Sequence, residues 1–354
     1  MSSPQPHRAT RRRAARVRTR RKRALLALAG LAVLAAIVLL ASGGGGGHVA
    51  KPVTASGASG SKGNAPAPRA ASVSVVQTGT LPAPIQDAAA AAVSPSRFLL
   101  MGGIDQAEAS VSDILSATAT GATRVGALPS ALHDASASVL SGAAYLFGGG
   151  VVESFSGITR VSASGAAQPA GQLPTPASDV ASVAIGATIY VVGGYTGQTP
   201  LRTILAWRPG ESARVVATLP KPLRYAAVAA LGGKLLIAGG TSGEAASRDV
   251  YSFDPTTRAL ARVGLLPTEL THAAAASIGG TMYVFGGRSA AADGQTRRIL
   301  AVGPDGTVHE AGLLPRALSD VAAVALGGGV VLAGGRDSAG RVQDTILTAK
   351  TGAV

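Results

Sequence analysis

Six side chains that can carry charge, accept hydrogen bonds or stack on a ligand recur along this chain of 354 residues. Each stands five residues after the proline of a Leu-Pro pair, and the intervals between them are 47, 45, 46, 47 and 48 residues. The six are Asp87, Asp134, Asp179, Tyr225, His272 and Asp320. Carboxylates that meet at one place repel unless they are protonated, paired with arginine or bridged by a cation. If the fold gathers these positions, they could bind a cation, a cationic ligand or a polyhydroxylated ligand.

Further polar residues flank these positions or follow six Gly-Gly pairs: Asp105, His133, Tyr195, Arg224, Glu244, Arg288, Arg336 and Asp337. We predict a binding site made of Asp87, Asp134, Asp179, Arg224, Tyr225, His272, Arg288, Asp320 and Arg336. Acid or base chemistry there would use His272 with Arg288 or Glu244. The structural alternative is that each Asp or His side chain hydrogen-bonds the backbone of the next repeat, as short polar side chains commonly do.

The sequence carries no signature of a known catalytic centre. No nucleophile elbow is present, and the histidines of residues 72–354 are His133, His272 and His309. The chain has no cysteine, so it can form neither a disulfide nor a Cys/His zinc site. We therefore assign no catalytic residue, no metal and no cofactor.

The elements that must position these residues repeat with the same period. An apolar strand runs into a Gly-Gly pair six times, in steps of 46, 45, 46, 47 and 48 residues. The pairs are Gly102-Gly103, Gly148-Gly149, Gly193-Gly194, Gly239-Gly240, Gly286-Gly287 and Gly334-Gly335. Such a period predicts an array of one supersecondary unit. We assign the glycines a structural role, because glycine allows unusual dihedral angles and close approach of neighbouring backbone.

The fourth repeat shows the unit most clearly. Apolar segments and turn residues predict strands at 225–231, 234–238, 249–253 and 259–263. Four short strands per unit are typical of a propeller blade. The sequence thus predicts an all-β, six-bladed propeller. Each of the six polar positions would open an innermost strand, so that they form a ring at the mouth of the central channel.

The two ends of the repeat region complement each other. The sixth unit lacks a fourth strand, whereas residues 72–80 precede the first Leu-Pro pair as a fourth strand does in other repeats. We predict that residues 72–78 join the last blade beside residues 344–348. This closure leaves no open sheet edge and favours a monomer.

These repeats resemble those of the kelch family. The doubled glycine after an apolar strand, Tyr251, the Asp254-Pro255 turn and the Leu-Pro pair stand where kelch repeats have them. Leu260 occupies the position of the family's tryptophan, so the motifs are degenerate. The resemblance covers residues 72–354 and implies a six-bladed propeller. Kelch-like propellers also include enzymes: copper oxidases, which need a cysteine that this chain lacks, and a sialic-acid mutarotase.

The first 71 residues divide into three segments. Residues 1–23 contain ten Arg or Lys, and residues 24–41 are eighteen residues without a polar side chain, about 27 Å long as a helix. Residues 42–71 have the Gly, Ser, Pro and Ala composition of a flexible linker. We predict a single-pass membrane anchor at 24–41, with the basic tail in the cytoplasm and the propeller outside. The alternative is a signal peptide cleaved near residue 41, which would release a secreted domain.

Of the net charge of +14, +13 belongs to that N-terminal part. Thirteen of the 32 Lys and Arg lie in residues 1–71, so 19 basic residues face 18 acidic ones in residues 72–354. A nearly neutral domain has no electrostatic footprint for nucleic acid. We expect instead a bacterial, extracytoplasmic binding or scaffold module for a protein or carbohydrate ligand. The alternative is a carbohydrate-active enzyme, similar to a sugar mutarotase or lyase, with its site at the channel mouth.

Overall fold

The computed structural model describes residues 72–290 and 294–352. The predicted tail, membrane span and linker, at 1–23, 24–41 and 42–71, lie outside the described residues and stay predictions. Within the described part of the chain, no helix is long and apolar enough to cross a membrane.

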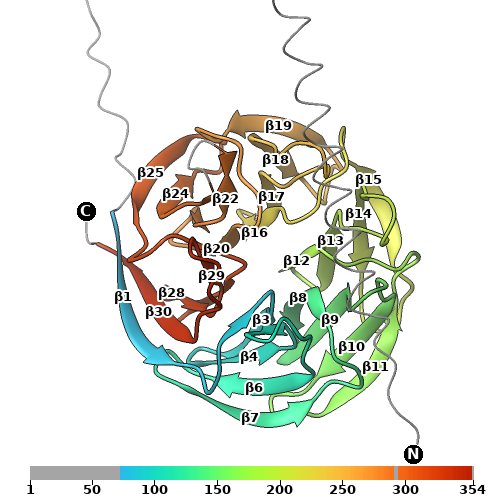
Figure 1. Ribbon diagram of the computed structural model, residues 1–354. Helices are drawn as coiled ribbons and strands as arrows, with labels where there is room; N and C mark the ends of the chain where they lie inside the picture. The colour runs from blue at the N-terminus through green and yellow to red at the C-terminus, as the bar shows by residue number, and fades with distance from the viewer. Residues whose placement is uncertain (1–71, 291–293, 353–354) are drawn as a thin grey trace, which may run out of the picture. The chain divides into compact units, whose positions relative to one another are not determined.

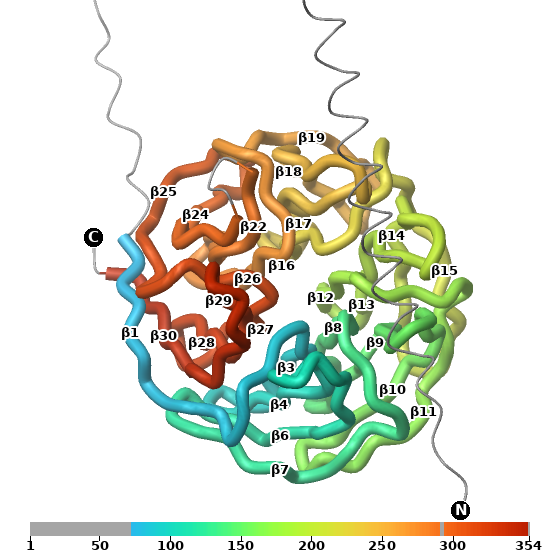
Figure 2. Tube along the Cα trace, in the orientation of Figure 1, coloured from blue at the N-terminus to red at the C-terminus, as the bar shows by residue number. Residues whose placement is uncertain are grey.

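The described residues form six four-stranded antiparallel sheets, which stand as blades around a central opening (Figure 1, Figure 2). Blade 1 contains β3 (Ala89–Ser94), β4 (Arg97–Met101), β6 (Asp113–Ala117) and β7 (Ala122–Ala127). Blade 2 contains β8 (His133–Leu140), β9 (Ala143–Gly150), β10 (Gly157–Val161) and β11 (Ala167–Gln172). Blade 3 contains β12 (Ala181–Ile185), β13 (Thr188–Val192), β14 (Thr203–Trp207) and β15 (Arg214–Thr218).

The remaining three blades repeat this order, with the innermost strand first. Blade 4 contains β16 (Ala227–Leu231), β17 (Lys234–Ala238), β18 (Asp249–Phe253) and β19 (Leu260–Leu265). Blade 5 contains β20 (Ala274–Ile278), β21 (Thr281–Phe285), β24 (Arg298–Val302) and β25 (Val308–Leu313). Blade 6 contains β27 (Ala322–Leu326), β28 (Gly329–Ala333), β30 (Thr345–Thr351) and β1 (Val73–Thr80). The prediction of an all-β, six-bladed propeller with four-stranded blades is confirmed.

Three pairs of two-residue strands lie in the connecting loops. They are β2 (Ile85–Gln86) with β5 (Ile104–Asp105), β22 (Arg288–Ser289) with β23 (Gly294–Gln295), and β26 (Leu318–Ser319) with β29 (Arg336–Asp337). The first and third pairs tie a loop to the segment that enters an innermost strand, whereas β22 and β23 pair within the loop between β21 and β24.

The first and last strands of the described chain close the ring. Strand β1 pairs antiparallel with β30, from Val73 opposite Thr351 to Thr80 opposite Thr345. The two ends of the repeat region thus lie side by side in blade 6 (Figure 1). The predicted closure by the N-terminal strand is confirmed, and it gives blade 6 the fourth strand that its own repeat lacks.

Six apolar clusters join the blades, and each cluster lies between two neighbouring blades. Trp207 on β14 is an example from the contact of blades 2 and 3. It is 1% exposed, and its ring lies 4.9 Å from Tyr145 and 5.5 Å from Phe147, both on β9. Aromatic contacts of this kind add to the stabilisation from burial. Because each core is shared, a blade depends on both of its neighbours.

The glycine pairs lie where neighbouring blades come closest. The first glycine of every pair has a φ between 58° and 69°, in the left-handed region. A Cβ atom on Gly239 would lie 2.3 Å from the carbonyl oxygen of Leu270 in the connection to the next blade. The same oxygen accepts a hydrogen bond of 2.8 Å from the N–H of Gly240. The other five pairs repeat this arrangement, so a side chain at the first glycine would push two blades apart.

Candidate functional site

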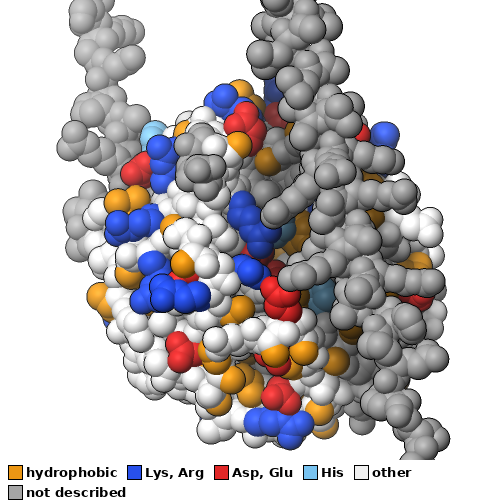
Figure 3. Space-filling view, in the orientation of Figure 1, with side chains coloured by type: hydrophobic (Ala, Val, Ile, Leu, Met, Phe, Trp, Pro, Cys, Tyr) orange, Lys and Arg blue, Asp and Glu red, His pale blue; other side chains and the backbone are white. Residues whose placement is uncertain are grey.

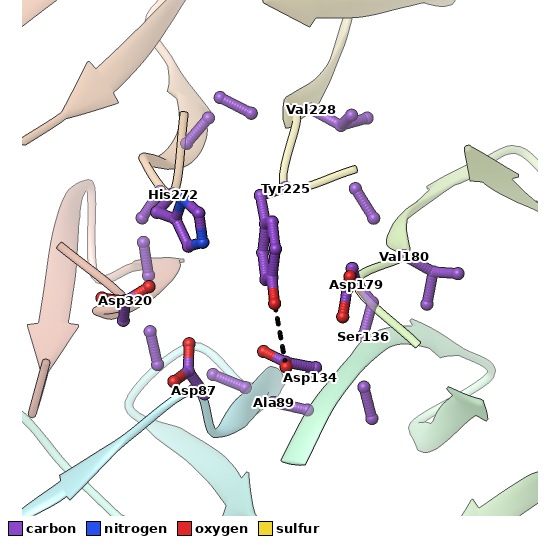
Figure 4. A pocket seen from close by; sticks show the side chains of 18 of the residues that line it. Asp87, Ala89, Asp134, Ser136, Asp179, Val180, Tyr225, Val228, His272 and Asp320 are labelled. Carbon is purple, nitrogen blue, oxygen red and sulfur yellow. Dashed lines mark hydrogen bonds between the residues drawn. The ribbon is translucent and has the colours of Figure 1, made fainter. Parts of the chain in front are cut away.

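The six polar positions from the six repeats lie together around the channel opening (Figure 4). We call Asp87, Asp134, Asp179, Tyr225, His272 and Asp320 the mouth ring. The prediction that each opens an innermost strand is wrong in detail. Five of them precede that strand by two residues, and Asp134 lies within β8 but has no partner in its ladder with β9. In the fourth repeat, β16 therefore begins at Ala227 rather than at Tyr225, while β17 and β18 have the predicted bounds and β19 ends at Leu265 instead of 263.

The reason for this offset is the backbone conformation of the mouth ring. All six residues have a φ between 52° and 59°, which L-amino acids seldom adopt and which interrupts a strand ladder. The turn points each backbone N–H at the preceding blade. There it donates to the carbonyl oxygen of the preceding ring residue over 2.8 to 3.3 Å, and Asp87 completes the circle by donating to Asp320.

A closed circle of backbone hydrogen bonds joins the blades at the mouth, which differs from the structural alternative that we drew from the sequence. That alternative had the Asp and His side chains bonding the backbone of the next repeat, but here the backbone itself joins the blades. The hydrogen bonds of the ring side chains go to other side chains instead. The ring side chains add further contacts between blades, as in the ion pairs of Asp179 with Arg224 and of Asp320 with Arg288, and all six line the opening.

Asp179 holds one side of the mouth ring. Its carboxylate is 2% exposed and forms an ion pair with Arg224 through two guanidinium nitrogens. The guanidinium carbon of Arg224 lies 3.9 Å from the centre of the Tyr195 ring, which is a cation–π contact. Asp134 hydrogen-bonds to Asp179 and also accepts a hydrogen bond of 3.1 Å from the hydroxyl of Tyr225.

Asp320 holds the opposite side, three blades away. Its carboxylate is 1% exposed and forms an ion pair with Arg288, while the hydroxyl of Ser319 donates to its Oδ2 atom over 2.5 Å. Oδ1 of Asp320 is buried without an N–H or O–H partner. The carboxyl group of Asp87 lies beside Asp320, whose charge helps to raise the pKa of Asp87.

The protonation of the ring follows from these contacts. Burial, with the neighbouring carboxylate of Asp179 second, raises the pKa of Asp134 to about 8. Burial, followed by the charges of Asp134 and Asp320, raises the pKa of Asp87 well above its ordinary value. At pH 7 Asp134 is therefore mostly a neutral carboxylic acid and the pKa of Asp87 is shifted in the same direction, whereas the carboxylates of Asp179 and Asp320 each form an ion pair with an arginine.

The two remaining ring residues form an aromatic pair. The rings of Tyr225 and His272 stack with their centres 3.7 Å apart and 23° between their planes. Burial lowers the pKa of His272 to about 4, against the opposing effect of Asp320, so the imidazole is neutral at pH 7. Its Nδ1 atom lies 3.1 Å from the hydroxyl of Thr271. Around the ring, Asp320 and Asp87 lie side by side, then Asp134 and Asp179, and the aromatic pair of Tyr225 and His272 lies between Asp179 and Asp320.

Arg224 and Arg288 match the charges of the two carboxylates that they contact. Side chains of both signs adjoin near the centre of this face (Figure 3). Among the residues that the structure describes, no group of three or more His, Cys, Asp or Glu side chains has the geometry to hold a metal ion. The structure shows arginine pairing at Asp179 and Asp320, and burial raises the pKa of Asp87 and Asp134.

The mouth ring opens into the central channel. A cavity of about 200 Å³ is lined by the ring and by the next residues of the innermost strands. A second cavity of about 320 Å³ continues along the same strands. Both are lined by Ala90, Ala137, Ser182, Val228, Ala275 and Ala323. The walls are mostly alanine, because six strands converging on one axis leave room only for small side chains.

The other predicted residues occupy different places. Arg336 points to blade 1, where its guanidinium lies 3.9 Å from the carboxylate of Glu108. Asp105 and Asp337 accept backbone N–H groups of their own loops, and Glu244 is exposed. The fold therefore brings Arg224 and Arg288 to the mouth ring and leaves Arg336 at its edge.

His133 lies beside the ring rather than in it. Its Nε2 atom is 3.6 Å from Oδ2 of Asp134, and its Nδ1 atom lies 2.8 Å from the hydroxyl of Ser110. Burial lowers its pKa, although the charge of Asp179 acts in the other direction. A neutral His133 adds no charge to the mouth.

Sequence analysis missed two residues that hold ring side chains. Ser319 is fully buried, donates to Asp320 and accepts a hydrogen bond of 3.2 Å from Nε of Arg288. Thr271 contacts His272 as described above. A signal for both was present, because the position four residues after each Leu-Pro proline is also polar: Gln86, His133, Ser178, Arg224, Thr271 and Ser319.

Comparison with known proteins agrees with this architecture. The Kelch motif matches residues 176–213 and 222–259, which fall in blades 3 and 4. Together with the six-bladed arrangement, this match decides the family. The domain is a kelch-repeat β-propeller.

A solved structure titled "Structure of YjhT" is similar to this kelch propeller, with a TM-score of 0.66 and 14% sequence identity over 76% of this chain and 95% of that chain. At this level of identity the likeness concerns the fold alone. No curated protein matches the chain with significant sequence similarity. The function of the kelch propeller must therefore be argued from its own mouth ring.

Proposed function

We propose that this protein is a membrane-anchored binding module whose mouth ring takes a small, uncharged, polyhydroxylated ligand, with carbohydrate as the ligand class. The observation that carries the proposal is a ring that is rich in hydrogen-bonding groups and whose ion pairs are matched within it. Two buried carboxyl groups with a raised pKa, two arginine-paired carboxylates, a tyrosine and a neutral histidine surround a cavity of about 200 Å³.

The groups around the cavity match what a sugar offers. A hydroxyl group both donates and accepts hydrogen bonds, and the mouth ring presents a carboxyl group that keeps its proton, Asp134, beside the arginine-paired carboxylate of Asp179. Arg224 and Arg288, which are 22% and 39% exposed, add charge-assisted donors at the edge. The stacked rings of Tyr225 and His272 supply apolar surface beside these polar groups.

A charged ligand fits the ring less well. A cation would find the ionised carboxylates already paired with arginine, and an anion would find the arginines already paired with carboxylates. Binding either ion at pH 7 would require an existing ion pair with a buried carboxylate to open, which is costly.

The binding test uses the full-length protein in detergent micelles. A glycan array identifies candidates, and calorimetry with the best sugar then compares wild type with His272→Ala, which removes half of the aromatic pair. His309→Ala is the matched control, since His309 is exposed on the outer strand β25. We expect affinity to fall at least about tenfold in His272→Ala alone, a loss of about 1.4 kcal/mol. Equal affinities of the two variants would place the sugar elsewhere, and an array without hits would refute the ligand class.

A second candidate function is a carbohydrate-active enzyme at the same site. The observation that favours it is the pKa of Asp134, about 8, which keeps a proton donor available at neutral pH. Tyr225, hydrogen-bonded to Asp134, would position or share that proton. Exchange between the anomers of a bound sugar, followed by NMR, tests this function. Asp134→Asn would then abolish exchange and keep binding, whereas unchanged exchange would exclude Asp134 as the acid.

The membrane anchor is a separate part of the proposal and rests on the sequence of residues 1–41. Its test is the behaviour of the full-length protein in cells. We expect it to stay in the membrane fraction after an alkaline wash and to expose the propeller to external protease. Recovery in the culture medium with an N-terminus near residue 42 would instead show signal cleavage.

A further inference from the structure

The loop between β9 and β10 of blade 2 differs from its counterparts in the other five blades. The third and fourth residues after its first glycine are Val151 and Val152, which are 49% and 92% exposed. At the same two places the other loops carry polar or small residues: Asp105-Gln106, Thr196-Gly197, Ser242-Gly243, Ser289-Ala290 and Asp337-Ser338. Two adjacent, solvent-exposed valines occur at only one of the six equivalent places, and exposed apolar surface of this kind can mark a binding site specific to blade 2.

An aromatic residue follows in the same loop. The N–H of Phe155 donates to the carbonyl oxygen of Gly149, a bond that every blade makes from the equivalent position. The residues at that position in the other blades are Val111, Leu201, Ser247, Thr296 and Gln343. Only blade 2 therefore places an aromatic ring there, and the ring is half-buried.

Phe155 lines a recess of about 430 Å³ beside the loop. The apolar part of its lining consists of Leu128, Pro129, Leu132, Leu146, Phe155 and Pro176. The leucines are buried, whereas Pro129 and Pro176 are exposed. The recess can thus accept an apolar side chain, and the two valines belong to the same loop as Phe155, which lines it.

The loops of blades 1 and 2 near this recess carry only acidic charges of their own, although Arg336 of blade 6 lies 3.9 Å from the carboxylate of Glu108. Residues 102–112 and 148–156, the corresponding loops of blades 1 and 2, contain Asp105, Glu108 and Glu153 and neither Lys nor Arg. In blades 5 and 6 the equivalent loops carry several arginines instead. A partner at blade 2 would therefore gain from basic side chains, which complement these acids and speed the encounter.

We infer that Val151, Val152, Phe155 and the recess, together the blade 2 rim, dock a protein segment that presents an apolar side chain flanked by Lys or Arg. The apolar side chain enters the recess, the valines cover it, and the basic groups face the acidic loops of blades 1 and 2. This site is separate from the mouth ring, so it stands whether or not the mouth binds a sugar.

The test selects peptides from a random display library on immobilised full-length protein. Selected peptides are then measured by fluorescence anisotropy against wild type, the double variant Val151→Ser/Val152→Ser, and the control Val76→Ser/Val215→Ser. The control valines are 59% and 54% exposed on the outer strands β1 and β15, so both variants remove two exposed valines without entering a core.

We expect the selected peptides to share an apolar residue flanked by Lys or Arg. Their affinity should fall on the order of tenfold or more in the blade 2 variant alone and should weaken as salt rises. Absence of enrichment, equal binding by both double variants, or peptides without basic residues would overturn the inference. A concentration-dependent dimer of wild type that the blade 2 variant abolishes would also overturn it, because the occupant would then be a second copy.

Discussion

Replacing Asp134 by asparagine should stabilise this protein, and the gain should grow with pH. The pKa of Asp134 is raised from an ordinary 3.8 to about 8 in the folded protein, chiefly by burial. A group whose folded-state pKa exceeds its unfolded value stabilises fully below the unfolded pKa and loses that contribution as pH rises to the folded pKa. Asp134 therefore lowers the free energy of unfolding progressively between about pH 4 and pH 8.

The magnitude follows from the proton linkage. Each pH unit within this window costs about 1.4 kcal/mol, so the carboxyl group destabilises the fold on the order of 4 kcal/mol at pH 7. An asparagine resembles the protonated acid, because its carbonyl oxygen can accept the hydroxyl of Tyr225 and its amide can donate to Asp179. At roughly 2 °C per kcal/mol, Asp134→Asn should raise the Tm by about 3 °C at pH 5 and by about 8 °C at pH 7.

The assay is the difference in Tm between variant and wild type, measured by circular dichroism from pH 5 to pH 9. Glu211→Gln is the control, since Glu211 is an exposed carboxylate whose partner Arg208 lies 3.9 Å away. Its Tm difference from wild type should stay near zero at every pH. A Tm difference for Asp134→Asn that does not change with pH, or a variant less stable than wild type at pH 7, would refute the protonated carboxyl pair.

Three further predictions concern the fold. Gly239→Val should prevent folding, because its Cβ would lie 2.3 Å from the carbonyl oxygen of Leu270; a folded variant by circular dichroism would contradict the close approach. Deleting residues 72–80 removes β1 from blade 6 and should abolish the cooperative thermal transition, whereas a sharp melt would show that the ring does not need this strand. Arg224→Ala leaves a buried carboxylate unpaired, so it should lower the free energy of unfolding, measured with denaturant, by about 3–5 kcal/mol. Arg336→Ala removes a 3.9 Å pair with an exposed partner and should lower it by less than about 0.5 kcal/mol. Equal losses would show that the buried pair contributes no more to stability than the exposed one.

Much of the fold could be predicted because its signals are local. The bounds of β17 and β18 follow from an apolar run that starts after one turn and stops at the next. The closure by β1 could be predicted from the strand that the sixth repeat lacks. The start of β16 could not be predicted, since the offset at Tyr225 comes from a positive φ, a conformation in which Asn, Asp and His are enriched but which a tyrosine does not indicate.

The candidate site was predictable in part for the same reason. Equal spacing after the Leu-Pro pairs placed the mouth ring at one end of the channel, because equivalent positions of a repeat lie at equivalent places in the ring. The spacing could not separate Arg288, whose guanidinium reaches Asp320, from Arg336, which turns to Glu108 in the next blade. Long side chains have several rotamers, and the neighbouring blade decides among them.

By itself, the sequence determined the number of blades, the strand that closes them and the residue types at the mouth, since these depend on spacing along the chain. Only the tertiary structure decided which carboxyl groups keep their protons and which meet an arginine. That choice depends on burial and on distances between side chains from different blades, which lie 32 residues or more apart in the sequence. The matched ion pairs of the mouth, and with them the kind of ligand we propose, are a property of the closed ring.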